Sequence, residues 1–204
     1  MKSLANAILK SDYLVSAETN FLANEDVAPS GCFLEGESKA IIEKDFLEET
    51  IEEDELKQNQ IILARAKLKK IYWGSYAPTE IYEWLDAHSG DFELIGSLLM
   101  KLLDEDDELH NTDIYFSTNK ITILEWFEVS KKYRQQGLGK LLAKKILDSA
   151  AARGECLIIQ PKLHDNEGND PERLKDFWLN LDVGGELVYN EEFNTIYSPV
   201  YGGL

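Results

Sequence analysis

The sequence predicts a single α/β domain, and three observations lead to that prediction: length, composition and the order of the apolar patterns. The chain has 204 residues, enough for one domain with some residues left for an extension. Hydrophobic residues make up 44% and charged residues 29%, a balance typical of soluble globular proteins. From residue 60 onward, segments with strand-like and helix-like patterns follow one another, which favours an α/β fold.

The N-terminal third has the weakest patterns. Residues 3–23 fit one or two short amphipathic helices, and residues 29–38 fit a short strand between two turns. Residues 43–56 carry eight acidic residues and one lysine, with apolar residues at helical spacing. This segment is either a solvated helix that packs one apolar stripe on the core, or an acidic recruitment surface.

The elements that follow residue 60 have clearer signals. The chain from 60 to 73 alternates as a long strand, and Pro78 suits the first position of a helix over 78–88. A second helix is predicted over 91–103, capped by Ser89 or Asp91. The remaining predicted elements are strands 112–118 and 120–130, a helix from Gly137 to Gly154, a buried strand 156–161, a helix 171–181, and a closing hairpin of 186–190 and 195–201.

Charge and targeting signals limit the partners and the location. The chain carries 21 basic and 38 acidic residues, a net charge of -17, so we expect it to bind neither nucleic acid nor an acidic membrane surface. No apolar run approaches the ~18 residues of a membrane span, and no signal peptide is evident, which predicts a cytoplasmic protein. Cys32 and Cys156 lack metal-ligand spacing, so we expect no metal site; two buried thiols are favoured, and a single disulfide is the alternative.

One segment stands out by its charge and its glycines. Residues 131–145 hold six of the 21 basic residues and no acidic residue. Gly137 and Gly139 allow close approach of a ligand, and the amide groups at the start of the following helix can bind an anion such as a pyrophosphate. An ordinary loop followed by a cationic helix is the alternative. A dinucleotide-binding fingerprint does not fit, because Leu142 stands where that motif has its third glycine. A P-loop does not fit either, because Leu141 follows Lys140 where that motif has serine or threonine.

The run R-Q-Q-G-L-G, residues 134–139, resembles the Q/R-x-x-G-x-G/A signature of the GNAT superfamily of acyl-CoA N-acyltransferases. The later segments CLIIQP and LKDFWLNLDV are similar to the next strand and helix of that family, so the resemblance covers roughly residues 112–201. It implies a mixed, largely antiparallel sheet flanked by helices. It further implies an acyltransferase domain over 59–204, preceded by a variable N-terminal extension over 1–58 that is helical, acidic and packed on the core.

The resemblance also implies a set of site residues. Phe127 and Val129 would pair through their backbones with the pantetheine arm of acetyl-CoA, and Arg134 would lie beside its pyrophosphate. Glu125 would serve as general base or amine anchor, a fitting role because an amine of pKa ~10 must lose a proton before it attacks. Trp126 and His164 would border the acceptor amine. The amides that would hold the pyrophosphate are those of Gln135, Gln136, Gly137, Leu138, Gly139 and Lys140.

The environment of Glu125 has two open interpretations. Strict alternation in the strand places Glu125 on the same face as Ile123, Phe127 and Val129, where burial of a carboxylate is costly. Either a lysine or arginine of a neighbouring strand forms a salt bridge with it, or this face opens where the sheet splays and the thioester meets the amine.

The resulting prediction is an N-acetyltransferase that moves an acetyl group from acetyl-CoA to a primary amine by direct attack. The amine belongs to a small molecule, a peptide or a protein, and a homodimer is one oligomeric state that the sequence leaves open. Trp178 occupies the position where the family often has an acidic tyrosine, for which Tyr189, Tyr197 or water would have to substitute. This departure motivates one alternative, an acyl-CoA-binding protein with little transferase activity; the charge motivates another, an acidic interaction module.

Overall fold

The structure is a computed structural model of the chain. The residues that it describes are 8, 15–23, 33–43, 60–72, 78–88, 90–103, 120–150, 155–161, 171–183 and 186–198. The predicted helix over 43–56 and the predicted strand over 112–118 therefore lie outside the described residues.

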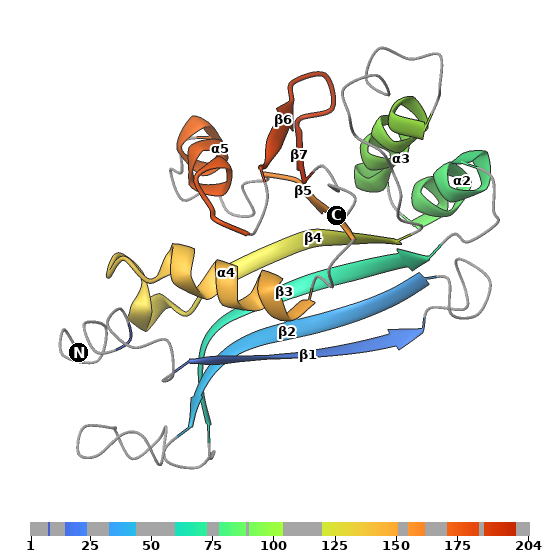
Figure 1. The fold of residues 1–204 in the computed structure, drawn as a ribbon. Helices are drawn as coiled ribbons and strands as arrows, with labels where there is room; N and C mark the ends of the chain where they lie inside the picture. Colours follow the sequence, from blue (N-terminus) through green and yellow to red (C-terminus); the bar gives the residue numbers. More distant parts are fainter. Residues whose placement is uncertain are drawn as a thin grey trace, which may run out of the picture.

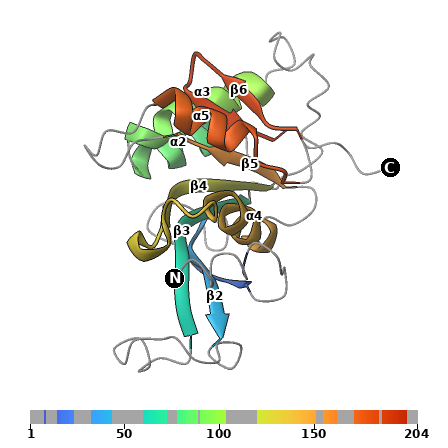
Figure 2. The same cartoon turned by 90° about the vertical axis from the view of Figure 1, so that its left-hand side faces the viewer.

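A seven-stranded sheet runs through the described part of the chain, in the order β1-β2-β3-β4-β5-β7-β6. Figure 1 shows the first four strands side by side, with β5, β6 and β7 continuing beyond β4, and Figure 2 shows β5 and β6 on the far side of β4 from β2 and β3. Neighbouring strands are antiparallel except β4 and β5, which are parallel, so the sheet is mixed and largely antiparallel as predicted. The strands are β1 (Ser16–Ala23), β2 (Phe33–Glu43), β3 (Gln60–Tyr72), β4 (Lys120–Val129), β5 (Cys156–Ile159), β6 (Val188–Asn190) and β7 (Thr195–Tyr197).

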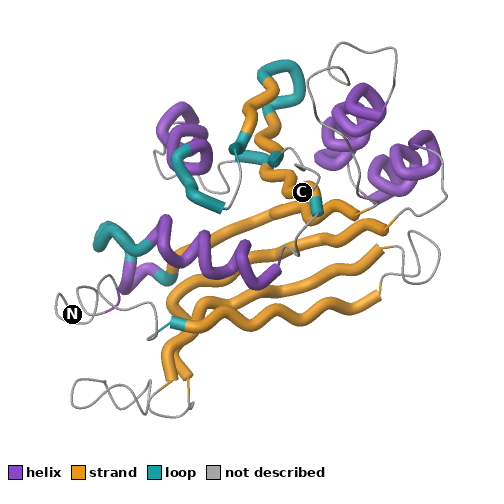
Figure 3. The backbone as a smooth tube through the Cα atoms, in the orientation of Figure 1, coloured by secondary structure: helices purple, strands orange, loops and turns teal. Residues whose placement is uncertain are grey.

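Helices pack on both faces of the sheet. Helix α4 crosses one face of strands β1 to β4, as Figures 1 and 3 show, and its residues share a core cluster with those of α5. Helices α2 and α3 pack against each other and contribute to a second cluster. The helices are α2 (Pro78–His88), α3 (Gly90–Leu103), α4 (Gly139–Ala150) and α5 (Pro171–Leu179), with a short 3-10 turn η3 (Lys131–Tyr133). None of the described helices is long and apolar enough to cross a membrane.

Strand β5 lies between these two clusters, and its successive side chains point into one and the other in turn. Cys156 and Ile158 pack in the cluster of α2 and α3, whereas Leu157 and Ile159 pack in the cluster of α4 and α5. All four residues are buried, as expected for a strand covered on both faces. Cys156 is a free, buried thiol, as predicted, and burial raises its pKa to about 12; Cys32 lies outside the described residues.

The N-terminal prediction was wrong for residues 16–23, which form strand β1 rather than a helix. Their exposure alternates with a period of two: Glu18 and Asn20 are exposed, whereas Thr19 and Phe21 turn toward α4 and the core. The predicted short strand within 29–38 extends to Glu43 in β2. Both strands belong to the same sheet as β3 and β4, and the division of the chain at residue 58 stays a prediction.

From residue 60 the predicted elements agree with the structure to within a few residues at their ends. The long strand, the two consecutive helices, the buried strand and the last helix are β3, α2, α3, β5 and α5. The closing hairpin is confirmed by the antiparallel pairing of β6 with β7. Helix α4 begins at Gly139 instead of Gly137.

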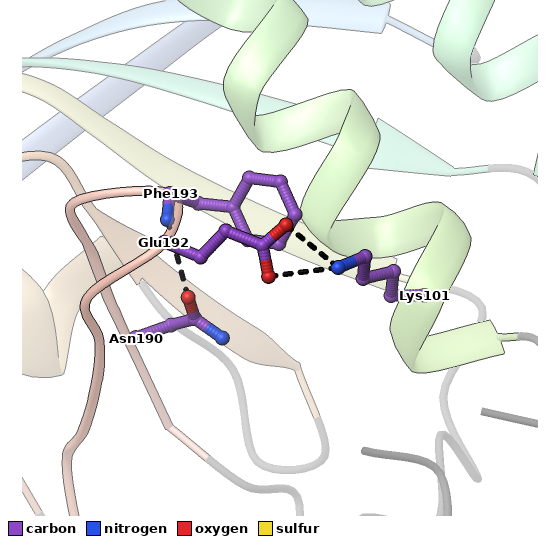
Figure 4. A network of polar contacts seen from close by, with 4 residues as sticks. All are labelled: Lys101, Asn190, Glu192 and Phe193. Atoms are coloured by element: carbon purple, nitrogen blue, oxygen red, sulfur yellow. Dashed lines mark hydrogen bonds and ion pairs between the residues drawn. The ribbon is translucent and has the colours of Figure 1, made fainter. Parts of the chain in front are cut away.

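Helix α3 is tied to the turn between β6 and β7 by an exposed ion pair. Figure 4 shows the ammonium of Lys101, which lies 2.7 Å from both carboxylate oxygens of Glu192. The same ammonium lies 5.1 Å from the ring centroid of Phe193, whose backbone N–H donates to Asn190 Oδ1 at 3.1 Å. Because the Glu192 side chain is 60% exposed, we expect this pair to contribute about 1 kcal/mol or less to stability.

A second ion pair is buried and joins three strands. Lys70 Nζ on β3 lies 3.1 Å from Glu155 Oε1, just before β5, and the Glu155 side chain is only 2% exposed. Thr122 on β4 donates its hydroxyl hydrogen to the other oxygen of Glu155 at 2.6 Å. The ring of Phe21 lies 5.0 Å from the Lys70 ammonium. The pair therefore holds β5 to β4 and β3 at the start of the parallel pairing.

We predict that Glu155→Gln lowers the free energy of unfolding by about 3–5 kcal/mol, because it leaves the buried Lys70 ammonium without a counter-charge. Glu192→Gln is the matched control, since it removes the same charge from the exposed pair with Lys101 and costs about 1 kcal/mol or less. Urea denaturation of the wild type and both variants measures the two losses. An equally small loss in both variants would contradict the burial argument.

Candidate functional site

Strand β4 has a free edge over its second half. It pairs with β5 from Ile121 to Leu124 and no further. The N–H of Ser130 donates to Leu63 O at 2.8 Å, so in the alternating antiparallel pattern the backbone groups of Phe127 and Val129 point away from β3. In the described residues, both groups of Phe127 and the N–H of Val129 have no hydrogen-bond partner on this edge. Such an edge can accept an extended ligand as an added strand.

The predicted alternation along β4 fails at Glu125. Lys67 pairs with Trp126 and Leu68 with Leu124, so Glu125 is an extra residue in a bulge. The bulge reverses the faces of the residues that follow it. Ile121 and Ile123 pack in the cluster of α2 and α3, whereas Phe127 and Val129 pack against the cluster of α4 and α5. The prediction that all these residues share one face was therefore wrong, because one inserted residue shifts the phase of a strand by one side chain.

The carboxylate of Glu125 has a cationic partner on the neighbouring strand. Lys69 Nζ on β3 lies 3.6 Å from Glu125 Oε2 and 3.2 Å from Glu35 Oε1 on β2. Glu125 is 36% exposed at its side chain, whereas Lys69 is 5% exposed. The salt-bridge interpretation of Glu125 is thus confirmed as a contact. The contact does not bury the carboxylate, which remains accessible at the bulge.

The loop before α4 presents a row of backbone amides that have no acceptor. Gln135 has φ 57° and Gly137 has φ 77°, whereas Gln136 between them does not have a positive φ. Such an alternation turns successive N–H groups toward one concave side, a geometry that binds anions. The first bond of the α4 ladder runs from Leu142 N–H to Leu138 O at 2.9 Å. Among the described residues, the N–H groups from Gly137 to Leu141 have no backbone acceptor.

Side chains within this loop support its backbone. Arg134 donates from Nε to Val129 O at 2.9 Å and forms an ion pair with Glu128, so it fastens the loop to the end of β4. Gln136 donates from Nε2 to Lys132 O at 2.9 Å, and its Oε1 is buried with no hydrogen-bond partner in the part of the chain that the structure describes. These contacts fix the backbone in the conformation that exposes the amides. Arg134, predicted beside a pyrophosphate, has its guanidinium at the free edge of β4.

The N-terminal half of α4 is fastened to the end of α5. The ammonium of Lys140 lies 3.4 Å from Asn180 O, and that of Lys144 donates to Asp182 O. Cations are favourable near the C-terminus of a helix, where carbonyl groups lack partners. A Cβ atom at Gly139 would lie 3.3 Å from the ring of Phe177, so a larger residue here would press on α5 and require the ring to shift. Part of the basic segment over 131–145 therefore has a packing role that charge counting did not reveal.

The remaining predicted residues lie as follows. Trp126 is half-buried on β4 and pairs in register with Lys67, and Leu138 is fully buried under α4. Trp178 is 4% exposed and packs edge-on against Phe127 at 5.5 Å between ring centroids. His164 lies outside the described residues.

Neither candidate tyrosine is placed as a simple replacement acid. The hydroxyl of Tyr189 donates to Asn194 Oδ1 at 3.0 Å in the turn between β6 and β7. Tyr197 is 2% exposed in the core of α2 and α3, where burial, and to a lesser degree Cys156, raises the pKa of its phenol. A proton donor for a departing thiolate is thus not evident from these two residues.

Lys69 is the residue that sequence reasoning missed. It lies between Leu68 and Lys70 in a strand that mixes apolar and basic residues, so nothing in the sequence distinguished this buried lysine from the exposed Lys67 of the same strand. Which carboxylate it meets depends on the bulge of β4, and the bulge has no signature in the local sequence.

The fold and this site define an α/β domain that presents an anion-binding helix start beside a free strand edge. Comparison with family models identifies the class: the model described as "Acetyltransferase (GNAT) family" matches residues 45–170. The match covers more than half of the chain, so the protein belongs to the GNAT acetyltransferase family, which uses acyl-CoA. Comparison with curated proteins gave no match.

If the loop amides bind the pyrophosphate of acetyl-CoA, Gly137→Asp should weaken that binding at least tenfold, about 1.4 kcal/mol or more. The substitution adds a side chain at φ 77° and a negative charge at the amide row. Gly90→Asp is the matched control, because it adds the same charge where a Cβ has open space. Calorimetric titration of both folded variants with acetyl-CoA measures the effect. Equal affinities in the two variants would remove the loop from the binding site.

Proposed function

We propose that this protein transfers an acetyl group from acetyl-CoA to a primary amine. The observation that carries the proposal is the row of amides from Gly137 to Leu141, which have no backbone acceptor among the described residues and adjoin the free edge of β4. A coenzyme A molecule has the two features that such a surface needs: a pyrophosphate for the amides and an extended amide-containing arm for the edge. Membership of the GNAT family supports the same assignment.

The acyl donor would lie across three elements. The pyrophosphate would meet the amides of the loop at the start of α4, where the helix dipole adds positive potential. The pantetheine amides would pair with the backbone of Phe127 and Val129, whose unbonded groups face the open side. The Val129 carbonyl is already bonded to Arg134, so the Phe127 carbonyl and the two N–H groups would make these bonds. The thioester would then lie close to the bulge.

The acceptor amine would lose its proton at Glu125. A protonated amine carries no lone pair, so the carboxylate, directly or through water, would take one proton before attack. The nitrogen would then attack the thioester carbonyl carbon, forming an N–C bond while the C–S bond breaks and the electron pair leaves with sulfur. The product is a neutral N-acetylated amine once the nitrogen gives up its second proton, and the thiolate of coenzyme A takes up one proton, directly from the nitrogen or through water.

Solvent can supply the proton for the thiolate. A free thiol has a pKa near 8.5, so the thiolate is a tolerable leaving group without a dedicated acid. This matters here because Trp178 has no useful proton to give and is buried between Phe127 and Phe177.

Trp178 also favours a second candidate, an acyl-CoA-binding protein with little transfer activity. A buried indole in edge-on contact with two phenylalanines has a packing function. Turnover distinguishes the two functions.

The test is release of free thiol from acetyl-CoA in the presence of small amines, aminoglycosides and lysine-containing peptides. Amine-dependent thiol release by the wild type supports the transferase. Tight acetyl-CoA binding with no release above the rate without protein, for every amine class, would favour the binding protein instead.

We predict that Glu125→Gln lowers kcat about 10²–10⁴-fold and leaves the affinity for acetyl-CoA nearly unchanged, because the variant keeps the shape and loses the base. Glu37→Gln is the matched control: Glu37 lies on β2, carries an ion pair with Lys39 at 3.0 Å and is 44% exposed at its side chain. Steady-state kinetics, calorimetry and thermal melts are compared on the same samples. Lowered stability with full activity would restrict Glu125 to its salt bridge with Lys69.

We also predict that kcat/KM for a cationic amine falls about two- to tenfold as ionic strength rises from low to physiological. The net charge of -17 attracts a cation over long range, and salt screens that attraction. The measurement is kcat/KM in a sodium chloride series at saturating acetyl-CoA. A flat profile would indicate a neutral acceptor or one that is guided only at short range.

A further inference from the structure

Lys69 is a lysine whose charge lies inside the protein. Its side chain is 5% exposed, although lysine is among the residues least often buried. It faces the side of the sheet covered by α3, since its ammonium lies 4.7 Å from the ring centroid of Phe92. Withdrawing an ammonium from water is costly unless opposite charges surround it. The position of Lys69 therefore depends on the groups that it meets.

Three such groups, on three separate elements, lie among the described residues. Glu35 on β2 lies 3.2 Å from the ammonium, Glu125 on β4 lies 3.6 Å from it, and Phe92 belongs to α3. Glu35 and Lys69 are also direct partners in the register of β2 and β3, so the first contact is set by the regular ladder. The ammonium thus has a position fixed by the sheet and by one helix.

Glu125 lies at a break in that ladder. It is the extra residue of the bulge and falls outside the one-to-one register of β3 and β4, so the regular spacing of side chains across the sheet does not set its direction. Its side chain is 36% exposed. Lys69 supplies the fixed charge toward which Oε2 is directed, and the exposed remainder of the carboxylate stays accessible.

A second carboxylate near the end of β4 is held differently. Glu128 forms an ion pair with Arg134, which belongs to the loop before α4 and not to the sheet. These contacts pair the two carboxylates of β4 with different cations: Glu125 with Lys69, and Glu128 with Arg134. Of the two, Glu125 is the one tied to the rigid sheet interior.

We infer that Lys69 is a positioning residue for Glu125, and that it holds the carboxylate at the bulge in the orientation that receives the acceptor's proton. This inference rests on the proposed transferase function. Glu35 acts one step further back, because it holds the Lys69 ammonium from the opposite side. Misplacement of a reacting group by about 1 Å can cost ~10²-fold in rate, so loss of Lys69 should affect turnover more than binding.

The experiment is a double-mutant cycle with Lys69→Met and Glu125→Gln in the full-length protein. We expect Lys69→Met to lower kcat about 10- to 100-fold, with acetyl-CoA affinity within about twofold of wild type. In the Glu125→Gln background the same change should alter kcat by less than about twofold, because residues that act through one another are not additive. Lys67→Met is the matched control, since Lys67 lies on the same strand and is exposed; it should leave kcat within about twofold of wild type.

Two further variants keep the test decisive if Lys69→Met fails to fold. Lys69→Arg retains the charge and should keep more activity than Lys69→Met in any folded sample. Glu35→Gln leaves Lys69 in place and loosens it, so kcat should fall about three- to tenfold, and this loss should disappear in the Glu125→Gln background.

The outcomes separate the two ideas. If Glu125→Gln is itself fully active, the proposed role of Glu125 fails and the positioning role of Lys69 fails with it. If Glu125→Gln is impaired but the Lys69 or Glu35 variants reduce kcat equally in both backgrounds, only the positioning role is overturned. A lower melting temperature with unchanged kcat in the Lys69 and Glu35 variants would likewise make Lys69 purely structural.

Discussion

Strand β4 is bonded to β3 along its length but to β5 only from Ile121 to Leu124, and the geometry of the candidate site depends on this asymmetry. Where β5 is bonded, from Ile121 to Leu124, the edge of β4 is already paired and cannot accept a ligand as an added strand. Where β5 is absent, the backbone of Phe127 and the N–H of Val129 have no partner among the described residues, and the bulge at Glu125 falls at the transition. A parallel neighbour that stops early therefore provides a binding edge without disturbing the antiparallel half of the sheet.

Features with local causes could be predicted from the sequence. Helix α2 has proline at its first position, β5 is a short apolar run, and β3 alternates over much of its length, so each has its signal within its own residues. The amide row before α4 was also predictable, because Gly137 and the basic residues beside it are contiguous in the chain. The same segment carries the resemblance to the GNAT family, which the family comparison confirmed.

Features that depend on pairing between distant strands could not be predicted. Strand β1 is stabilised by its ladder with β2, and its own sequence, SAETNFLA, has too weak a pattern to exclude a helix. The bulge at Glu125 is a property of the register between β3 and β4, so sequence alternation placed Phe127 on the wrong face. The contact of Glu125 with Lys69 follows from that register, and so does the burial of Lys69.

The buried pair of Lys70 and Glu155 has a consequence for the order in which the chain is made. When residues up to 150 have left the ribosome, β1 to β4 and α4 have been made. This part of the chain contains all the described residues that the candidate site uses. Lys70 then has no counter-charge from Glu155, and β4 has no second neighbour. The nascent chain at this stage would bury an unpaired ammonium or leave the sheet open to water. Completion of the sheet thus awaits synthesis of the short segment that contains Glu155 and β5, and a chain that stops before it carries the site without its support.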